Sequence, residues 1–344
     1  MSTADFAAFS NNAIAFASIV YAFAFVAHIA EWAAGRKLPA SVSASTRASA
    51  TRREPVTVSA GAAAPSDVPP SEASAHGTAA SGEDLAARAL TAEKLGRIGV
   101  ALTVVAAALH LAGLVTRGLG SDPVRVPWGN MYEFAVAGAF GVTAIYLLLL
   151  RRYSLRWLGL LVTGFALVVL MLAVLLLYVP AGPLVPALHS YWLVIHVVAA
   201  VIATGAFTVG AMASLLYLVK SRDEARPSPR TTGYIARLPG AQSLDRVAYR
   251  VHAFGFPIWT FAALIAGPIW AEYAWGRYWG WDPKEVWAFI TWVVYAAYLH
   301  ARATAGWRGR AAAVIALVGF ATLMFNFVGI NLFGSGLHSY SGLD

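Results

Sequence analysis

A dense group of tryptophans marks the stretch of the chain where the side chains could bind a ligand. Residues 275–287 hold four of the twelve tryptophans. Tryptophan favours the boundary between membrane and water, but that preference does not explain why Trp275, Trp279 and Trp281 lie together with glycines between them. Such a cluster forms a flat aromatic wall that suits a large planar ligand. Because histidines lie in or beside apolar segments on either side, the pattern indicates haem.

Three of the eight histidines lie where they could serve as axial ligands. At a helical rise of about 1.5 Å per residue, His300 lies deep in its apolar segment, whereas His196 lies near the start of its segment and His338 follows the last one. We therefore expect two levels, with His196 and His338 beside the tryptophans. His28 matches His300 in depth. A lone membrane histidine often only bonds a neighbouring helix, and we expect no ligand role for His76, His110, His189 and His252.

The same residues resemble a known family of haem-handling proteins. Its tryptophan-rich "WWD" signature is matched by Trp275, Gly276, Trp279, Trp281, Asp282 and Pro283. The continuation through residues 284–292 and 298–302 resembles the CcsA/ResC branch, which belongs to the System II machinery of cytochrome c biogenesis. Residues 190–197 and 336–340 match it as well, so the resemblance covers roughly residues 95–344.

The resemblance implies a haem-binding role for each of these positions. His196 and His338 correspond to an external pair that ligates haem b under the signature loop, and His300 to a membrane ligand. The ligand opposite His300 would come from a ResB-type membrane partner, with His28 as the alternative within this chain. The other implied partner is apocytochrome c, through its Cys-x-x-Cys-His segment, with thiol-reducing proteins acting indirectly. Together with its partner, the chain would form part of a membrane cytochrome c synthase.

The composition is that of an integral membrane protein. The chain is 59% hydrophobic and 12% charged, with a mean hydropathy of +0.63. We expect an all-α polytopic bundle embedded in lipid. Eight apolar runs are long enough to span a membrane: 12–33, 97–116, 131–150, 157–179, 191–219, 249–270, 284–303 and 311–333.

The basic residues predict the orientation. With the N-terminus outside and eight crossings, all but four of the 25 lysines and arginines fall on the inner side. The four on the outer side are Arg117, Arg125, Arg277 and Lys284. Both termini and the tryptophan loop are therefore predicted to face the extracytoplasmic side of the plasma membrane. The net charge of +8 reflects this asymmetry and does not indicate nucleic-acid binding.

Three regions are expected along the chain. Residues 1–35 form an N-terminal membrane helix, and residues 36–95, rich in Ala, Ser, Pro and Thr, form a disordered cytoplasmic linker. Residues 96–344 form a seven-helix haem-handling domain with its signature loop at 271–287. Within it, Asp282 and Asn130 are each expected to cap a helix, with Glu285 and Glu133 completing the capping boxes.

The favoured function is haem delivery across the membrane and presentation to apocytochrome c for thioether attachment. Cysteine is absent, so any sulfur must come from a partner. We expect no catalytic acid or base, because positioning the haem is what the reaction requires of this chain. Two alternatives stay open: a haem exporter without ligation activity, and a structural subunit of a respiratory complex that binds b-type haem.

Overall fold

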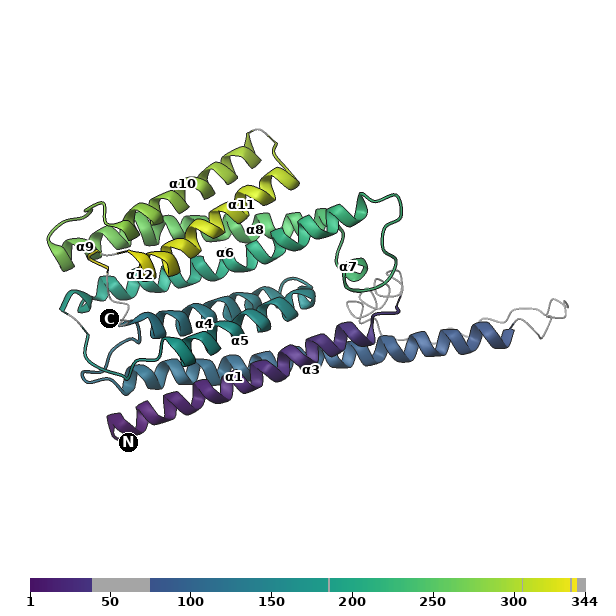
Figure 1. The fold of residues 1–344 in the computed structure, drawn as a ribbon, viewed down its shortest axis with the longest axis horizontal. Helices are drawn as coiled ribbons and strands as arrows, with labels where there is room; N and C mark the ends of the chain where they lie inside the picture. The colour runs from purple at the N-terminus through teal and green to yellow at the C-terminus, as the bar shows by residue number, and fades with distance from the viewer. Residues whose placement is uncertain (39–74, 185, 305, 335, 339–344) are drawn as a thin grey trace, which may run out of the picture.

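The computed structural model describes residues 1–38, 75–184, 186–304, 306–334 and 336–338, and these residues form a bundle of helices (Figure 1). No strand occurs among the described residues, so the all-α prediction is confirmed. The long helices are α1 (Thr3–Ala34), α3 (Ala75–Leu119), α4 (Met131–Leu150), α5 (Gly159–Leu176), α6 (Tyr191–Glu224), α8 (Ala241–Phe261), α10 (Pro283–Ala303) and α11 (Arg310–Met324).

Two of these helices continue through a π-helical turn. The turn η3 (Ala262–Ala266) joins α8 to α9 (Gly267–Trp275), and η4 (Phe325–Gly329) joins α11 to α12 (Ile330–Phe333). The shorter elements are η1 (Arg156–Leu158), η2 (Pro186–Leu188) and α7 (Tyr234–Arg237). Successive long helices run in opposite directions, so the N-terminus, the loop between α9 and α10 and the end of α12 meet at one end of the bundle (Figure 1).

Seven helical segments in the described part of the chain are long and apolar enough to cross a membrane, where the sequence predicted about eight. The segment outside this count is α10. It has 21 residues and runs beside α11, but its tryptophans, tyrosines, histidine and charged ends lower its hydropathy. The chain is a multi-pass membrane protein, and α10 runs alongside its membrane-compatible helices.

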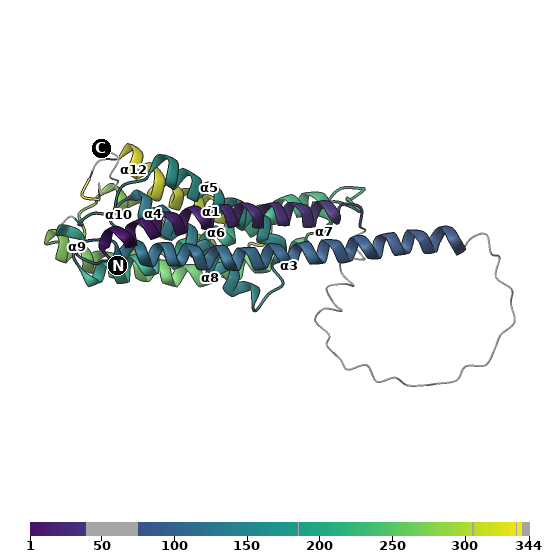
Figure 2. The ribbon, with the colours of Figure 1, turned by 90° about the horizontal axis from the view of Figure 1, so that it is seen from below.

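The last part of the predicted linker is helical. Residues 39–74 lie outside the described residues, but residues 75–95 belong to α3. This stretch has few large apolar residues, which is why the composition suggested disorder. It is nevertheless rich in alanine and contains leucine, glutamate, lysine and arginine, which are strong helix formers. The start of α3 projects beyond the other helices, so local propensity rather than packing sustains it (Figure 2).

The helix α6 lies at the centre of the bundle. The helices α1, α3, α4 and α5 lie on one side of it, and α8, α10 and α11 on the other (Figure 1). Against α4, the contact depends on Gly141 and Gly205. A Cβ atom on Gly205 would lie 2.8 Å from the carbonyl oxygen of Gly141. Small residues of this kind let membrane helices approach closely and gain dispersion contacts.

This close contact predicts that one methyl group added at Gly205 destabilises the protein. Gly205→Ala should lower the free energy of unfolding by about 1–3 kcal/mol, because the added atom meets backbone that must shift. The matched control is Gly138→Ala on α4, where a Cβ would meet nothing within 4 Å. Thermal unfolding of the purified protein in detergent measures both variants. Equal stability of the two would show that the close approach of α4 and α6 is wrong.

Candidate functional site

The C-terminal segment folds back onto the tryptophan loop. The Nδ1 atom of His338 lies 3.0 Å from a carboxylate oxygen of Asp282. The backbone N–H of Leu337 donates to the other oxygen of the same carboxylate, at 2.7 Å. Two residues that the sequence singled out separately, one before α10 and one after α12, are therefore in direct contact. The rest of the C-terminal motif, residues 339 and 340, lies outside the described residues.

Asp282 also begins α10, as expected. Its side chain accepts from the N–H of Lys284 at 3.0 Å, and its own N–H donates to Glu285 at 3.0 Å, which closes a capping box. Glu285 further accepts from the N–H of Gly280 at 2.8 Å and so fixes the end of the loop. The capping prediction for Asp282 is confirmed, and the additional contact with His338 was not foreseen.

The charge state of Asp282 follows from these contacts. Burial raises the pKa of Asp282, but hydrogen bonds from His338, Lys284 and Leu337 outweigh burial, and the pKa lies below its usual value. The side chain is therefore an ionised carboxylate at neutral pH and can only accept hydrogen bonds. In the neutral imidazole of His338, Nδ1 must therefore carry the hydrogen, and Nε2 keeps the lone pair. This is the arrangement that orients and strengthens metal-binding histidines.

His196 is oriented in the same way from a different helix. Its Nδ1 atom lies 2.9 Å from the carbonyl oxygen of Ala262, at the start of the π-helical turn η3. A carbonyl can only accept, so Nδ1 carries the hydrogen and Nε2 is again the free ligand atom. A Cβ on Gly267 would lie 3.2 Å from the imidazole, so a residue without a side chain admits the ring there. π-helical turns such as η3 often occur at functional sites.

Trp270 joins the two histidines. Its ring stacks on His196 at 5.9 Å between centroids and meets His338 edge-on at 5.5 Å. Trp275 lies 4.8 Å from Trp270 and 4.7 Å from His338. Trp270 is 3% exposed, and its indole N–H donates to the carbonyl oxygen of Ala187. The sequence did not distinguish it from other interfacial tryptophans, because only the fold shows that it lies between two histidines from distant segments.

Trp279 and Trp281 form a separate pair at the tip of the loop. Their rings meet edge-on at 5.8 Å, and Trp281 is 69% exposed. The backbone of Trp281 has a φ of 56°, a left-handed conformation that costs a bulky residue about 1–2 kcal/mol. The buried indole N–H of Trp279 has no partner among the described residues. The three predicted tryptophans thus contribute to two surfaces, one around His338 and one at the tip.

His300 lies at the opposite end of the bundle. It occupies the last turn of α10, and its side chain is exposed. His28 is fully buried on α1, with Nδ1 at 3.2 Å from Glu31. Because α1 packs on α3 and α5 while α10 packs on α11 and α8, the two histidines lie on opposite sides of the bundle (Figure 1). The fold therefore does not bring His28 to His300.

The remaining histidines lie where structural roles were expected. His110 is buried, and its Nε2 atom lies 3.0 Å from the carbonyl oxygen of Val136. His252 is buried among aromatic rings, including Tyr295 at 5.3 Å. His189 is exposed in the loop before α6. Of His76, only the backbone, within α3, is described.

A buried ion cluster holds the neighbouring outer loops. Glu133 pairs with Arg117 at 2.9 Å and with Arg125 at 2.7 Å, and all three side chains are nearly inaccessible. Asn130 caps α4 by accepting from the N–H of Glu133, as predicted, but the Glu133 carboxylate bonds the N–H of Gly129 instead of closing the box. The cluster supports the loop whose Trp128 packs against the aromatic site.

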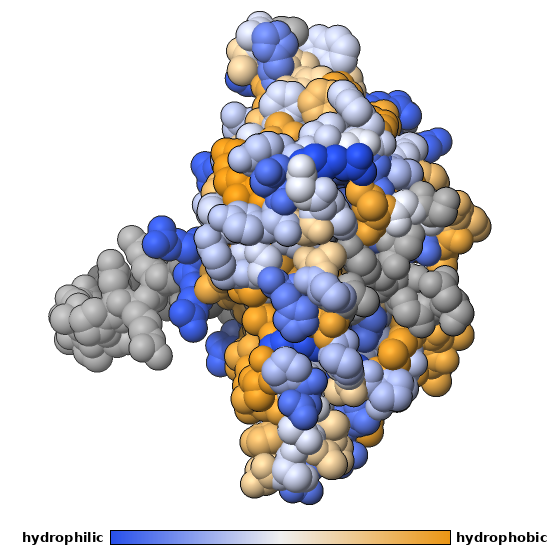
Figure 3. All heavy atoms as spheres, turned by 90° about the vertical axis from the view of Figure 1, so that its left-hand side faces the viewer, coloured by the Kyte–Doolittle hydropathy of each residue, from blue (hydrophilic) through white to orange (hydrophobic). Residues whose placement is uncertain are grey.

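The end of the bundle that carries this site is polar at its centre. Figure 3 looks onto that end and shows hydrophilic residues across the middle of the face, with hydrophobic residues at its flanks. Of the four basic residues assigned to it, Arg117 and Arg125 pair with Glu133. The other two, Arg277 and Lys284, have no ion pair within the part of the chain that the structure describes.

Comparison with known proteins shows that these residues lie in a region shared with one protein family. Residues 128–338 match the family model described as cytochrome C assembly protein. A cytochrome c biogenesis protein CcsA of Synechococcus sp. (strain JA-3-3Ab) is 36% identical over 298 residues, which covers 72% of this chain and 86% of the relative. The CcsA protein of Synechococcus elongatus is 39% identical over 256 residues, covering 62% of this chain and 78% of the relative.

The contacts of Asp282 predict a pH-dependent anchor. Asp282→Ala should lower the free energy of unfolding by about 1–2 kcal/mol and expose the amide of Leu337 to hydrogen exchange. Because the folded pKa of Asp282 is lowered, its contribution is present above the unfolded carboxyl pKa of about 3.9 and is lost as the pH falls through the folded value.

Hydrogen exchange of the Leu337 amide and thermal unfolding, each followed from neutral pH to below the unfolded carboxyl pKa, measure the contribution of Asp282. Asp282→Asn should be milder, because asparagine also caps helices. Asp122→Asn, an exposed change at the same end of the bundle, is the control and should change neither property. A Leu337 amide that exchanges equally fast in the parent protein and in Asp282→Ala would refute the anchor.

Proposed function

This chain belongs to the cytochrome c assembly family, and from this premise we propose that it delivers haem b across the membrane and presents it to apocytochrome c. The sequence resemblance to CcsA proteins is confirmed, and with it a role in the maturation of c-type cytochromes. The observation that carries the finer proposal is the pair His196 and His338. Both lie against Trp270, and both have Nδ1 occupied, so that Nε2 is available to iron.

The chemistry around this pair fits haem as a substrate. Two imidazoles supply axial ligands, and indole faces supply apolar contact for the macrocycle. Arg277 and Lys284, the two outer basic residues without ion pairs among the described residues, supply positive charge for the propionates. Trp279, which is partly buried, and the exposed Trp281 would cover the edge that faces the incoming polypeptide.

The bond-forming step needs no acid or base from this chain. A cysteine thiol of apocytochrome c adds across a haem vinyl group, so that the sulfur bonds carbon, the thiol hydrogen is taken up and a thioether forms. Since this chain has no cysteine, both sulfurs come from the Cys-x-x-Cys-His segment, which thiol-reducing proteins keep reduced. The contribution of this chain is to hold and orient the haem.

The position of His300 supports a second membrane protein as the source of the ligand opposite it. Its side chain is exposed at the far end of α10, and α1 with His28 lies on the other side of the bundle. We assign the opposite ligand at this level to a ResB-type partner that covers α10. Haem would be held there first and reach His196 and His338 later, with that second site on the extracytoplasmic side of the plasma membrane.

A haem exporter without ligation activity uses the same residues and is the second candidate. Covalent cytochrome c formed in the presence of the partner distinguishes the two functions. A structural b-haem subunit is disfavoured, because it requires two histidines on facing helices at matched depth. The one such pair expected in this chain, His28 and His300, lies on opposite sides of the bundle.

The ligand assignment predicts a graded response to histidine replacement. His300→Ala should deplete bound haem most, whereas His196→Ala or His338→Ala should allow loading but lower mature cytochrome c at least about tenfold. Exogenous imidazole should partly restore the latter two, because it can fill a vacated axial position. His189→Ala, an exposed change near the same site, is the control and should mature cytochrome c normally. Full haem and full maturation in all three ligand variants would exclude the assignment.

The loop assignment predicts a loss of function without a loss of insertion. Replacing Trp279 and Trp281 together by alanine should abolish maturation, since a stacking surface is local, while membrane anchoring is shared among twelve tryptophans and fourteen tyrosines. Membrane abundance, bound haem and covalent cytochrome c are measured in each variant. The control is Trp307→Ala, which removes an exposed indole at the other end of the bundle. Normal maturation in the double variant would reduce the pair to membrane anchors.

A further inference from the structure

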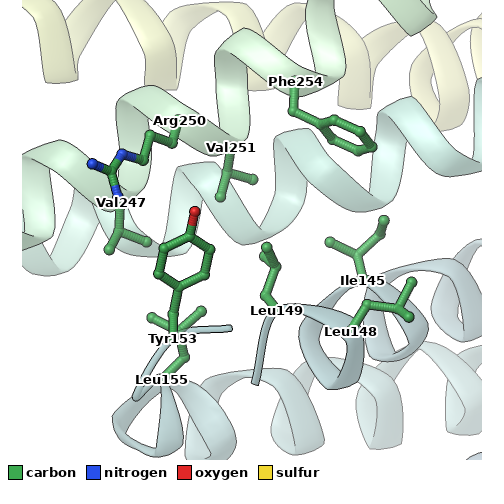
Figure 4. A pocket seen from close by; sticks show the side chains of 9 residues that line it. All are labelled: Ile145, Leu148, Leu149, Tyr153, Leu155, Val247, Arg250, Val251 and Phe254. Carbon is green, nitrogen blue, oxygen red and sulfur yellow. The ribbon is translucent and has the colours of Figure 1, made fainter. Parts of the chain in front are cut away.

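A pocket opens between α4 and α8 at the end of the bundle away from the histidine pair. Both helices pack on α6. Its volume is about 230 Å³. Figure 4 shows the lining, which comes from α4, the turn after it and α8: Ile145, Leu148, Leu149, Tyr153, Leu155, Val247, Arg250, Val251 and Phe254.

The apolar part of the pocket faces the side of the bundle. Leu155 and Val251 are buried at 2% and 5% exposure and form its inner wall. Leu148 and Phe254, by contrast, are 58% and 51% exposed. In a membrane-spanning bundle, these exposed side chains lie against lipid chains. The pocket is therefore open to the hydrocarbon region and can admit a chain that remains attached to a lipid.

One end of the pocket is polar and positively charged. The guanidinium of Arg250 lies 5.9 Å from the centre of the Tyr153 ring, and the Tyr153 hydroxyl points toward it (Figure 4). Within the described part of the chain, Arg250 has no carboxylate partner. Arg151 and Arg152 in the turn after α4, and Arg246 one helical turn before Arg250 on α8, are also exposed. The charge at this end favours a phosphate, because juxtamembrane arginines attract anionic lipids.

We propose that this pocket binds an anionic phospholipid of the leaflet at the arginine-rich end of the bundle. One acyl chain lies between α4 and α8 along Val251 and Phe254, and the phosphate lies against Arg250 and the Tyr153 hydroxyl. The pocket volume is below the ~300–1,000 Å³ of pockets that enclose drug-sized ligands. Haem is larger than most drug-sized ligands, so this pocket is too small to enclose it. No histidine lines the pocket, so the site is distinct from the haem positions.

Lipid retention tests the site directly. The full-length protein is reconstituted in nanodiscs containing equal phosphatidylglycerol and phosphatidylcholine, extracted into mild detergent, and analysed by native mass spectrometry. The parent protein should retain phosphatidylglycerol preferentially. Arg250→Ala should retain about fivefold less, and Arg250→Lys should keep most of it. Arg222→Ala removes an exposed arginine from the same end of the bundle, on α6, and should retain as much as the parent.

A second variant tests the acyl-chain half of the site. Val251→Trp should fill the buried wall and reduce retention while Arg250 remains in place. Equal retention of the two lipids, or equal losses in Arg250→Ala and Arg222→Ala, would overturn the proposal. Loss of haem with unchanged lipid in Arg250→Ala would overturn it as well, because the pocket would then hold haem.

Discussion

The carboxylate of Asp282 is the constraint on which the geometry of the site depends. It starts α10, accepts the amide of Leu337 and orients the imidazole of His338, so one ionised group joins the loop, a helix and the C-terminal segment. The loop before α10 and residues 336–338 after α12 both lie outside helices, so no regular secondary structure holds them together. Without this acceptor, Leu337 and His338 would lose the hydrogen bonds to the loop that hold the His338 ring beside Trp270 and Trp275.

The two histidines of the site are fixed by different devices with the same result. His338 donates to a carboxylate, and His196 donates to a carbonyl at the start of a π-helical turn. Both devices determine which ring nitrogen carries hydrogen, and both leave Nε2 free. The charges follow a similar division. Arg117 and Arg125 share the carboxylate of Glu133 and support the loops, whereas Arg277 and Lys284 have no ion pair among the described residues.

Much of this arrangement could be predicted because it depends on local sequence. Apolar runs gave the membrane helices, and residue types at helix starts gave the caps at Asp282 and Asn130. The role of Trp270 could not be predicted, because it arises where α6, α9 and the C-terminal segment meet. The separation of His28 from His300 depends in the same way on helix packing, since equal depth does not imply the same side of a bundle. Composition underestimated the helix at residues 75–95, whose alanines favour helix.

The central claim is that His196 and His338 bind one haem iron between them. It is tested most directly by electron paramagnetic resonance of the purified protein, loaded with ferric haem and carrying His300→Ala so that only the outer site can ligate. The account predicts a low-spin bis-imidazole spectrum with hyperfine coupling from two histidine nitrogens. A high-spin spectrum, or coupling from a single histidine, would contradict it.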